Sequence, residues 1–277
     1  MSMTVGLHMP NGFAGAGPHG LAGIAALAEE LGYDSLWTAD HVVLPSPRVA
    51  PSPLEPDAPL LDAVVSLAYV AAHTERILLA TGCVVLPQRD PLVLAKQLAS
   101  VDVLSGGRLV FGVVAGYLEP ELRALGVPLE GRGPRTAEYV RAIRALWEDA
   151  SPAFHGRYVS FKDVDAHPRP VRRVPVVMGG HTRAAHRRAA ELADGWYGWM
   201  LGLRAAAAQV ESVRAEAAAA GRTLEISVTP ARPLDPENVR AYADLGVDRL
   251  IVSHRPGLPL DELEEFVRRN APGQVLL

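Results

Sequence analysis

Asp40 and His41 follow closely after an apolar run, Asp34–Trp37, that predicts a buried strand. A carboxylate next to a histidine at the end of a strand can orient the imidazole or stabilise its charge, which suits the ring for proton transfer near neutral pH. An aspartate that caps a turn, beside a polar loop histidine, would give the same two residues. We take Asp40 and His41 as a candidate catalytic pair, and the residues alone leave both interpretations open.

A second candidate site is the glycine pair Gly179-Gly180, which follows the apolar run Val174–Met178. A helical pattern resumes at His181-Thr182, so the glycines would lie at a helix N-terminus, where free N–H groups and the helix dipole bind phosphate. An ordinary turn between a strand and a helix would look the same. The chain has no Walker lysine and no GxGxxG spacing, so a phosphate here would lie on a barrel and not on a nucleotide-binding open sheet.

Two further predicted strands end in small residues, Thr81-Gly82-Cys83 and Gly112–Gly116. Strand ends without side-chain bulk leave room for a large, flat ligand. The segment Asp194–Trp199 adds three aromatic residues and two glycines. At least one of these aromatics is expected to pack between sheet and helices, and another could form the wall of a pocket for a planar ring. We include Trp196 among the candidate cofactor-binding residues.

Charge and residue spacing argue against several classes of protein. The net charge of −4 argues against nucleic acid or an anionic membrane as partner. His181 and His186 are five residues apart, so they do not share a helix face as metal ligands, and there is no GxSxG motif. A lone cysteine, Cys83, excludes an internal disulfide and fits a reducing compartment. With no signal segment and no membrane-length apolar run, we expect a soluble cytoplasmic protein without a metal site.

The elements that must position these residues alternate between strand and helix. Apolar, β-rich runs occur at Thr4–Met9, Asp34–Trp37, Ile77–Val85, Leu109–Val114, Val174–Met178, Gly195–Trp199, Leu224–Val228 and Arg249–Val252. Eight such units in one domain, residues 1–277, predict an α/β fold of the closed (β/α)₈ barrel type more readily than an open sheet. Two insertions interrupt the repeat: proline-rich Val42–Pro59 after the second strand, and Ser151–Val174, with a predicted short hairpin, before the fifth.

Four segments in order resemble the bacterial luciferase-like oxidoreductases, and within them the shorter F420-dependent group. The matching segments are Gly32–His41, Thr74–Tyr117, Arg132–Trp147 and Pro175–Trp196. The resemblance covers most of residues 1–200 and is weak beyond them. It implies a (β/α)₈ barrel that binds F420 or FMN across its C-terminal mouth, often as a homodimer.

Carried over residue by residue, the resemblance implies that His41 contacts a deazaflavin and acts as acid or base, with Asp40 holding its orientation. Gly82-Cys83 matches a bulge with a non-proline cis peptide behind the ring. Ala115-Gly116 matches a pair beside the cofactor tail, and Met178-Gly179-Gly180 matches the phosphate-binding turn. The first strand ends His8-Met9-Pro10-Asn11, without the acidic residue that some relatives place there for substrate.

The first function expected from this resemblance is F420-dependent hydride transfer between C5 of the deazaflavin and a small organic substrate. The alternatives are an FMN-dependent monooxygenase that uses oxygen, a non-catalytic flavin-binding protein, and a sugar-phosphate barrel enzyme without a redox cofactor. The only lysines, Lys96 and Lys162, are poorly placed for the last of these. A homodimer is expected through a helix face that carries Leu94, Leu98 and Val101, although the same residues would face the sheet in an ordinary amphipathic helix.

Overall fold

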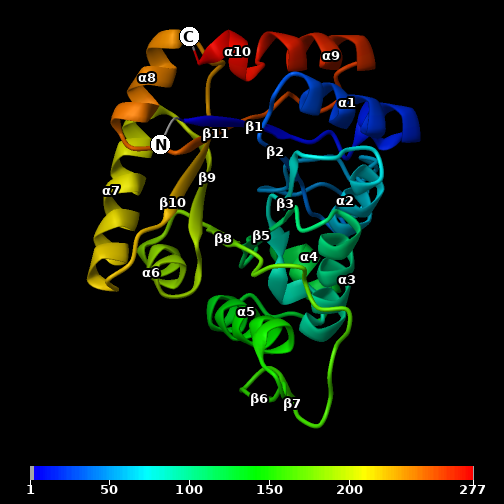
Figure 1. Cartoon of the computed structure of the whole chain (residues 1–277), viewed down its shortest axis with the longest axis vertical. Coiled ribbons are helices and arrows are strands. Elements are labelled where there is room, and N and C mark those ends of the chain that lie inside the picture. Colours follow the sequence, from blue (N-terminus) through cyan, green and yellow to red (C-terminus); the bar gives the residue numbers. More distant parts are fainter. Residues whose placement is uncertain (1–2, 277) are drawn as a thin grey trace.

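A closed parallel sheet forms the centre of the molecule in a computed structural model that describes residues 3–276 (Figure 1). Its strands within that range are β1 (Thr4–His8), β2 (Ser35–Thr38), β3 (Leu78–Thr81), β4 (Val84–Val85), β5 (Leu109–Val114), β8 (Val176–Gly179), β9 (Gly195–Leu201), β10 (Glu225–Pro230) and β11 (Arg249–Val252). They are ordered β3-β2-β1-β11-β10-β9-β8-β5-β4, and β3 also pairs with β5. Because β3 and β4 occupy one barrel position on either side of Gly82-Cys83, the sheet closes as the predicted eight-stranded barrel.

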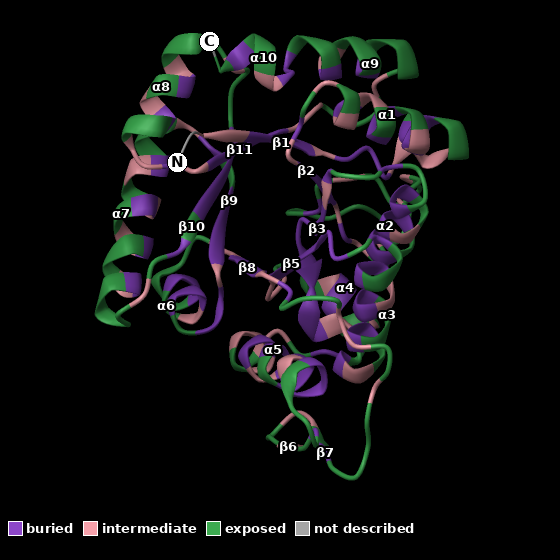
Figure 2. Cartoon of the chain, in the orientation of Figure 1, coloured by how far each residue is buried: buried purple, intermediate pink, exposed green. Residues whose placement is uncertain are grey.

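Helices lie outside the barrel and cover its strands (Figures 1 and 2). In the described range they are α1 (Pro18–Glu30), α2 (Ala63–Ala71), α3 (Pro91–Leu104), α4 (Glu119–Ala124), α5 (Arg132–Glu148), α6 (Arg183–Leu192), α7 (Leu203–Ala219), α8 (Pro236–Asp244), α9 (Leu260–Arg269) and α10 (Pro272–Val275). Two short 3₁₀ turns occur at Phe13–Ala16 and Leu86–Gln88. The main core lies between the strands and these helices, and a smaller apolar cluster fills the barrel itself.

Capping residues explain where several helices begin and end. The Asp90 carboxylate accepts from the Leu92 and Val93 amides at the start of α3, and Asp235 forms a capping box at the start of α8. Gly106 and Gly246 follow the ends of these helices with φ of 69° and 78°. This left-handed conformation is readily available only to glycine, so both glycines end a helix as the sequence predicts.

Both insertions are present at the predicted places. Residues 42–59 form most of the connection between β2 and α2. They carry two cis X-Pro bonds, at Pro47 and Pro51. The second insertion contains an antiparallel hairpin of β6 (Phe154–His155) and β7 (Ser160–Phe161), which projects from the lower end of the molecule in Figure 1. The long connection before β8 therefore leaves the barrel instead of covering its C-terminal mouth.

The barrel interior is closed at its N-terminal end by an ion cluster around Arg249. This arginine on β11 donates from Nε to Asp34 Oδ2 at 2.6 Å and pairs with Glu225 at the start of β10. Its guanidinium also lies 5.7 Å from the ring centre of Trp37. Because Asp34 directly precedes β2, a single side chain connects segments more than two hundred residues apart.

The helix face proposed above for association is not exposed. Leu94, Leu98 and Val101 of α3 are each no more than 2% exposed, because they pack toward the barrel. The exposed apolar side chains in this region include Val65 on α2 and Val93 and Leu104 on α3. None of the helices in residues 3–276 has the length and apolar character needed to cross a bilayer.

Candidate functional site

His41 lies just after β2 and is held by a carboxylate from a different loop. Its Nδ1 is 2.9 Å from Oε2 of Glu121, on α4 after β5. The second carboxylate oxygen, Oε1, accepts from the Val42 amide at 2.7 Å. The Glu121 side chain is only 1% exposed. An ionised carboxylate can only accept, so this contact places the imidazole proton on Nδ1 and leaves Nε2, which has no partner among residues 3–276, available for proton transfer.

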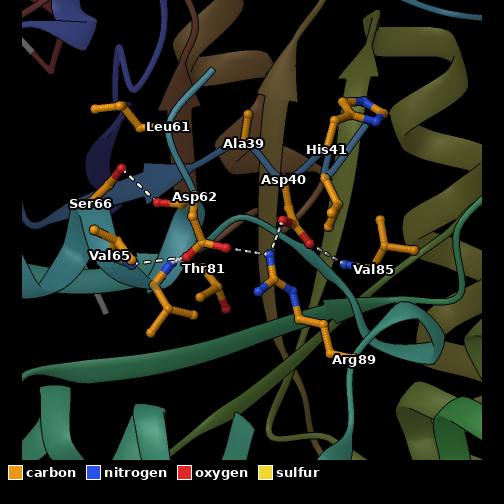
Figure 3. Close-up of polar contacts among 12 residues, drawn as sticks. Ala39, Asp40, His41, Leu61, Asp62, Val65, Ser66, Thr81, Val85 and Arg89 are labelled. Carbon is orange, nitrogen blue, oxygen red and sulfur yellow. Dashed lines mark hydrogen bonds and ion pairs between the residues drawn. The ribbon is translucent and has the colours of Figure 1, made fainter. Parts of the chain in front are cut away.

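Asp40 does not orient His41, contrary to the expectation from the sequence. Its buried carboxylate accepts from the Val85 amide at 2.9 Å and from Arg89 at 2.5 Å. Figure 3 shows the imidazole of His41 pointing away from this network. Adjacent residues at a strand end diverge in direction, so Asp40 fixes the loop that carries His41 while a carboxylate from β5 fixes the ring.

Arg89 joins Asp40 to the start of α2. It also donates to Asp62 Oδ2 at 2.9 Å, and Asp62 caps α2 through the Val64 and Val65 amides. Burial alone would raise the pKa of Asp62, but these amides and the Arg89 guanidinium outweigh it and hold the pKa below its usual value. The network therefore fastens both ends of the first insertion to the rim of the barrel.

Cys83 follows β3 at the C-terminal end of the barrel strands. The peptide bond between Gly82 and Cys83 is cis, as the resemblance predicts. The thiol lies inside the barrel cluster, and a β carbon on Gly112 or Gly179 would lie 3.3 or 3.6 Å from its sulfur. Burial raises the pKa of this thiol well above its ordinary value, so it is not a nucleophile.

The turn between β8 and α6 begins with two glycines, Gly179 and Gly180, which have no side chains. A β carbon on Gly179 would lie 2.8 Å from Val114 of β5, and Gly180 has φ of +125°, a conformation that other residues rarely adopt. Thr182 caps only the Ala185 amide among the first amides of α6, at 3.2 Å. The structure thus presents a helix N-terminus beside two glycines that carry no side chain over their backbone, which fits the phosphate end of a flavin or deazaflavin.

The other residues predicted to contact the cofactor lie either at the mouth of the barrel or in the core. Ala115 and Gly116 end β5 at the mouth and are partly exposed, and the Gly116 carbonyl accepts from Arg132 Nε at 2.9 Å. The side chain of Met178 is buried against the helices, so only its backbone borders the turn.

Trp196 is not a pocket wall. Its side chain is fully buried in the layer between sheet and helices, where it packs at 5.6 Å against the ring of His186. Its indole N–H donates to the Gly180 carbonyl at 3.0 Å. Trp196 therefore supports the glycine turn from beneath and cannot contact a ring at the mouth.

Comparison with known proteins identifies the family of this barrel. Residues 3–257 match the model of the luciferase-like monooxygenases. The chain belongs to this family. An uncharacterised protein of Mycobacterium tuberculosis is 33% identical over 262 residues, which cover 90% of this chain and 92% of that protein.

Relatives of known activity use two different cofactors. The FMNH₂-dependent dimethylsulfone monooxygenase of Pseudomonas putida is 35% identical over 144 residues, 50% of this chain and 40% of that protein. The structure of an F420-dependent secondary alcohol dehydrogenase with an F420-acetone adduct superposes with a TM-score of 0.77 at 17% identity, covering 96% of this chain and 98% of the other. The luciferase-like fold is thus shared with enzymes of both kinds, and the fold alone does not select between them.

Glu121 and Tyr117 are the site residues of this luciferase-like chain that sequence reasoning missed. The Tyr117 ring meets the His41 ring edge-on with centroids 6.3 Å apart. Burial, and then the charge of Glu121, raise the pKa of Tyr117. A signal for Glu121 was available: it lies with Leu118 and Leu122 at helical spacing, so it is a carboxylate on an apolar helix face.

Proposed function

We propose that this chain is an F420-dependent oxidoreductase, in which His41 exchanges a proton with a small organic substrate. When bound, the deazaflavin would supply or accept a hydride at C5. The glycine turn at Gly179-Gly180 and the N-terminus of α6 would hold its phosphate, and the Gly82-Cys83 backbone would lie behind its ring.

The observation that carries the proposal is the buried contact between His41 Nδ1 and Glu121. It fixes one tautomer and keeps Nε2 ready to take a proton from the substrate or return it. With the cofactor bound, oxidation would balance: the substrate would give up a hydride to the cofactor and a proton to His41, and reduction would run in the opposite direction. Glu121 stabilises the imidazolium that forms, because its buried carboxylate lies 2.9 Å away.

The second candidate is an FMN-dependent monooxygenase, which the P. putida relative supports by its cofactor. F420 comes first because a positioned acid–base group is what paired hydride and proton transfer requires. A non-catalytic flavin-binding protein would have no use for a histidine oriented in this way.

Equilibrium titration of the purified protein with F420 and FMN, each followed by fluorescence, tests the cofactor. We expect F420 to bind, and Gly179→Val to weaken it by about tenfold or more, because a side chain at this position meets Val114 and must displace the turn. Gly202→Val is the matched control, because it changes another glycine that precedes a helix but has open space around it. Tight binding of FMN without binding of F420 would select the monooxygenase.

Replacement of His41 by alanine tests the catalytic role. Turnover should fall by about 10² to 10⁴, the usual contribution of general acid–base catalysis, while affinity for F420 changes little. Unchanged turnover with a true substrate would show that His41 is only a loop residue.

A further inference from the structure

The mouth of the barrel has a second half that the proposed cofactor contacts leave free. His41, the Gly82-Cys83 bulge and the Gly179-Gly180 turn follow β2, β3, and β8, which are on one side of the strand order. The strands β9, β10, β11 and β1 complete the circle on the other side. The side chains that end these strands therefore border a part of the mouth that lies beside the proposed cofactor contacts, because the Trp199 amide donates to His181 Nε2 at 3.2 Å, next to the Gly179-Gly180 turn.

His8 and Trp199 form the wall of this free half. His8 is the last residue of β1 and Trp199 lies near the end of β9, yet their ring centroids are 5.1 Å apart. Trp199 is 43% exposed, whereas Trp37, Trp147 and Trp196 are buried. A large aromatic face left open at the mouth, beside an imidazole, is typical of a site for a ligand with a flat apolar part.

Several polar atoms of this wall have no partner among residues 3–276. His8 makes no side-chain hydrogen bond or ion pair among residues 3–276, although it is only partly exposed. His254, after the neighbouring β11, donates from Nδ1 to the Arg255 carbonyl at 3.0 Å and leaves Nε2 buried without a partner. Unpaired polar atoms at the barrel mouth are groups that a ligand can satisfy.

This half of the mouth also carries no net charge next to the wall. Burial, and then the nearby His254, lower the pKa of His8 to about 3, and burial lowers the pKa of His254. No carboxylate in the described range pairs with either ring, and the exposed Arg255 lies 3.4 Å from Glu262. Both imidazoles are therefore neutral. His8 can accept or donate a hydrogen bond, whereas Nε2 of His254 can only accept one, because its proton lies on Nδ1.

We propose that His8 and Trp199 bind the organic substrate, and that this substrate is an uncharged molecule with a flat apolar body and one hydroxyl or carbonyl oxygen. The body packs on the Trp199 indole and the oxygen bonds to His8. The N–H of a neutral His8 can donate to the oxygen of an alcohol or of a carbonyl, so His8 accommodates both forms of a redox pair and leaves the hydroxyl proton for His41. This rests on the proposed function, because it assigns the substrate side of the same mouth.

A set of compounds that differ only in charge and oxidation state tests the proposal. Benzyl alcohol, benzaldehyde and benzoate share a ring and differ at the oxygen-bearing carbon. Saturation-transfer NMR with the purified protein, alone and then with saturating F420 or FMN, should show millimolar binding of the alcohol and aldehyde. Benzoate should bind at least about tenfold more weakly, because neutral imidazoles give a buried carboxylate no charged partner.

Substitutions of His8 and Trp199 test whether the probes bind at these two residues. His8→Ala should weaken binding of both neutral probes by about three- to tenfold, the effect of one hydrogen bond. Trp199→Leu should weaken it further by removing the aromatic face. The matched control is His73→Ala, because His73, just after the end of α2, and Tyr69 on α2 form another histidine–aromatic pair, with centroids 4.5 Å apart. If His8→Ala does not fold, His8→Asn keeps a polar group and takes its place.

Equal or tighter binding of benzoate, binding of none of the probes, or unchanged binding in His8→Ala would overturn the proposal. Failure of the proposed function is separate, since it would appear as loss of cofactor binding in the titrations above. Probe binding that depends on His8 in a protein that binds neither F420 nor FMN would keep the neutral pocket and reject the redox role.

Discussion

Replacement of Glu121 by glutamine changes one buried contact without changing its size. The carboxylate now accepts from the Val42 amide at 2.7 Å and from His41 Nδ1 at 2.9 Å. The amide of glutamine has one acceptor oxygen and one NH₂ group, so it can accept from only one of these donors. The Val42 N–H is fixed by the backbone, whereas the imidazole can change tautomer. We expect the proton of His41 to move from Nδ1 to Nε2.

The consequence for catalysis is larger than the consequence for stability. With the proton on Nε2, His41 has no lone pair with which to take a proton from the substrate, so turnover should fall by about 10² to 10⁴. The free energy of unfolding should fall by no more than about 1–3 kcal/mol, the cost of one unpaired buried donor. Affinity for the cofactor should change little, because its proposed contacts lie elsewhere.

Two measurements separate this explanation from general damage. Heteronuclear NMR of the imidazole nitrogens reports the tautomer of His41 without any substrate, and urea unfolding reports stability. Glu119→Gln is the matched control: it lies on the same helix, is half exposed and pairs with Arg123 only among the described residues. If Glu121→Gln keeps the Nδ1-protonated tautomer and full turnover, Glu121 does not orient His41 and the reasoning is wrong.

Three further predictions concern packing, pH and association. Gly112→Ala would place a β carbon 1.9 Å from a carbonyl oxygen of the neighbouring strand, so urea unfolding should show a loss of about 1–3 kcal/mol or more, whereas Gly23→Ala, in open space within α1, should gain up to about 1 kcal/mol. The folded pKa of Asp62 is lowered, so its contribution to stability is present above its unfolded pKa of about 3.9 and is lost as the pH falls through the folded value. Asp62→Asn should therefore show a shallower loss of stability in acid, and an unchanged acid limb would contradict the role of its ion pair. We expect a homodimer through the exposed side chains Val65 and Val93, which Val65→Asp with Val93→Asp should convert to monomers in analytical ultracentrifugation; a monomeric wild type at micromolar concentration would reject it.

The barrel could be predicted from the sequence because each strand–helix unit is marked by a pattern of neighbouring residues. Strands of apolar residues alternate with helices that begin at a capping aspartate and end at a glycine, as at Asp90 and Gly106. These signals depend on neighbouring residues only. The same locality explains why the positions of the glycine turn and of the cis peptide at Gly82-Cys83 were found from short motifs.

Contacts between loops could not be predicted in this way. Glu121 is eighty residues from His41, and nothing in either segment states that the loops after β2 and β5 meet. The adjacent Asp40 was the nearer carboxylate in sequence and the wrong partner in space. The choice of Trp196 instead of Trp199 as the tryptophan at the mouth has another cause. Strand β9 is apolar on both faces, so the alternation of its residues does not reveal which side chains face the barrel interior.

The pairing of β1 with β11 sets an order for synthesis of the chain. Residues 4–7 align with residues 249–252, and Arg249 supplies the ion cluster at the barrel's N-terminal end. During translation, β1 is among the first strands made, while one of its two neighbours is among the last. The edge of β1 that pairs with β11 therefore stays open, and Asp34 lacks its partner Arg249, until nearly the whole chain has emerged. During this time the nascent protein exposes a strand edge that other chains can pair with. Closure of the barrel is thus a late event, and protection of this edge before closure falls to chaperones or to speed of synthesis rather than to the fold.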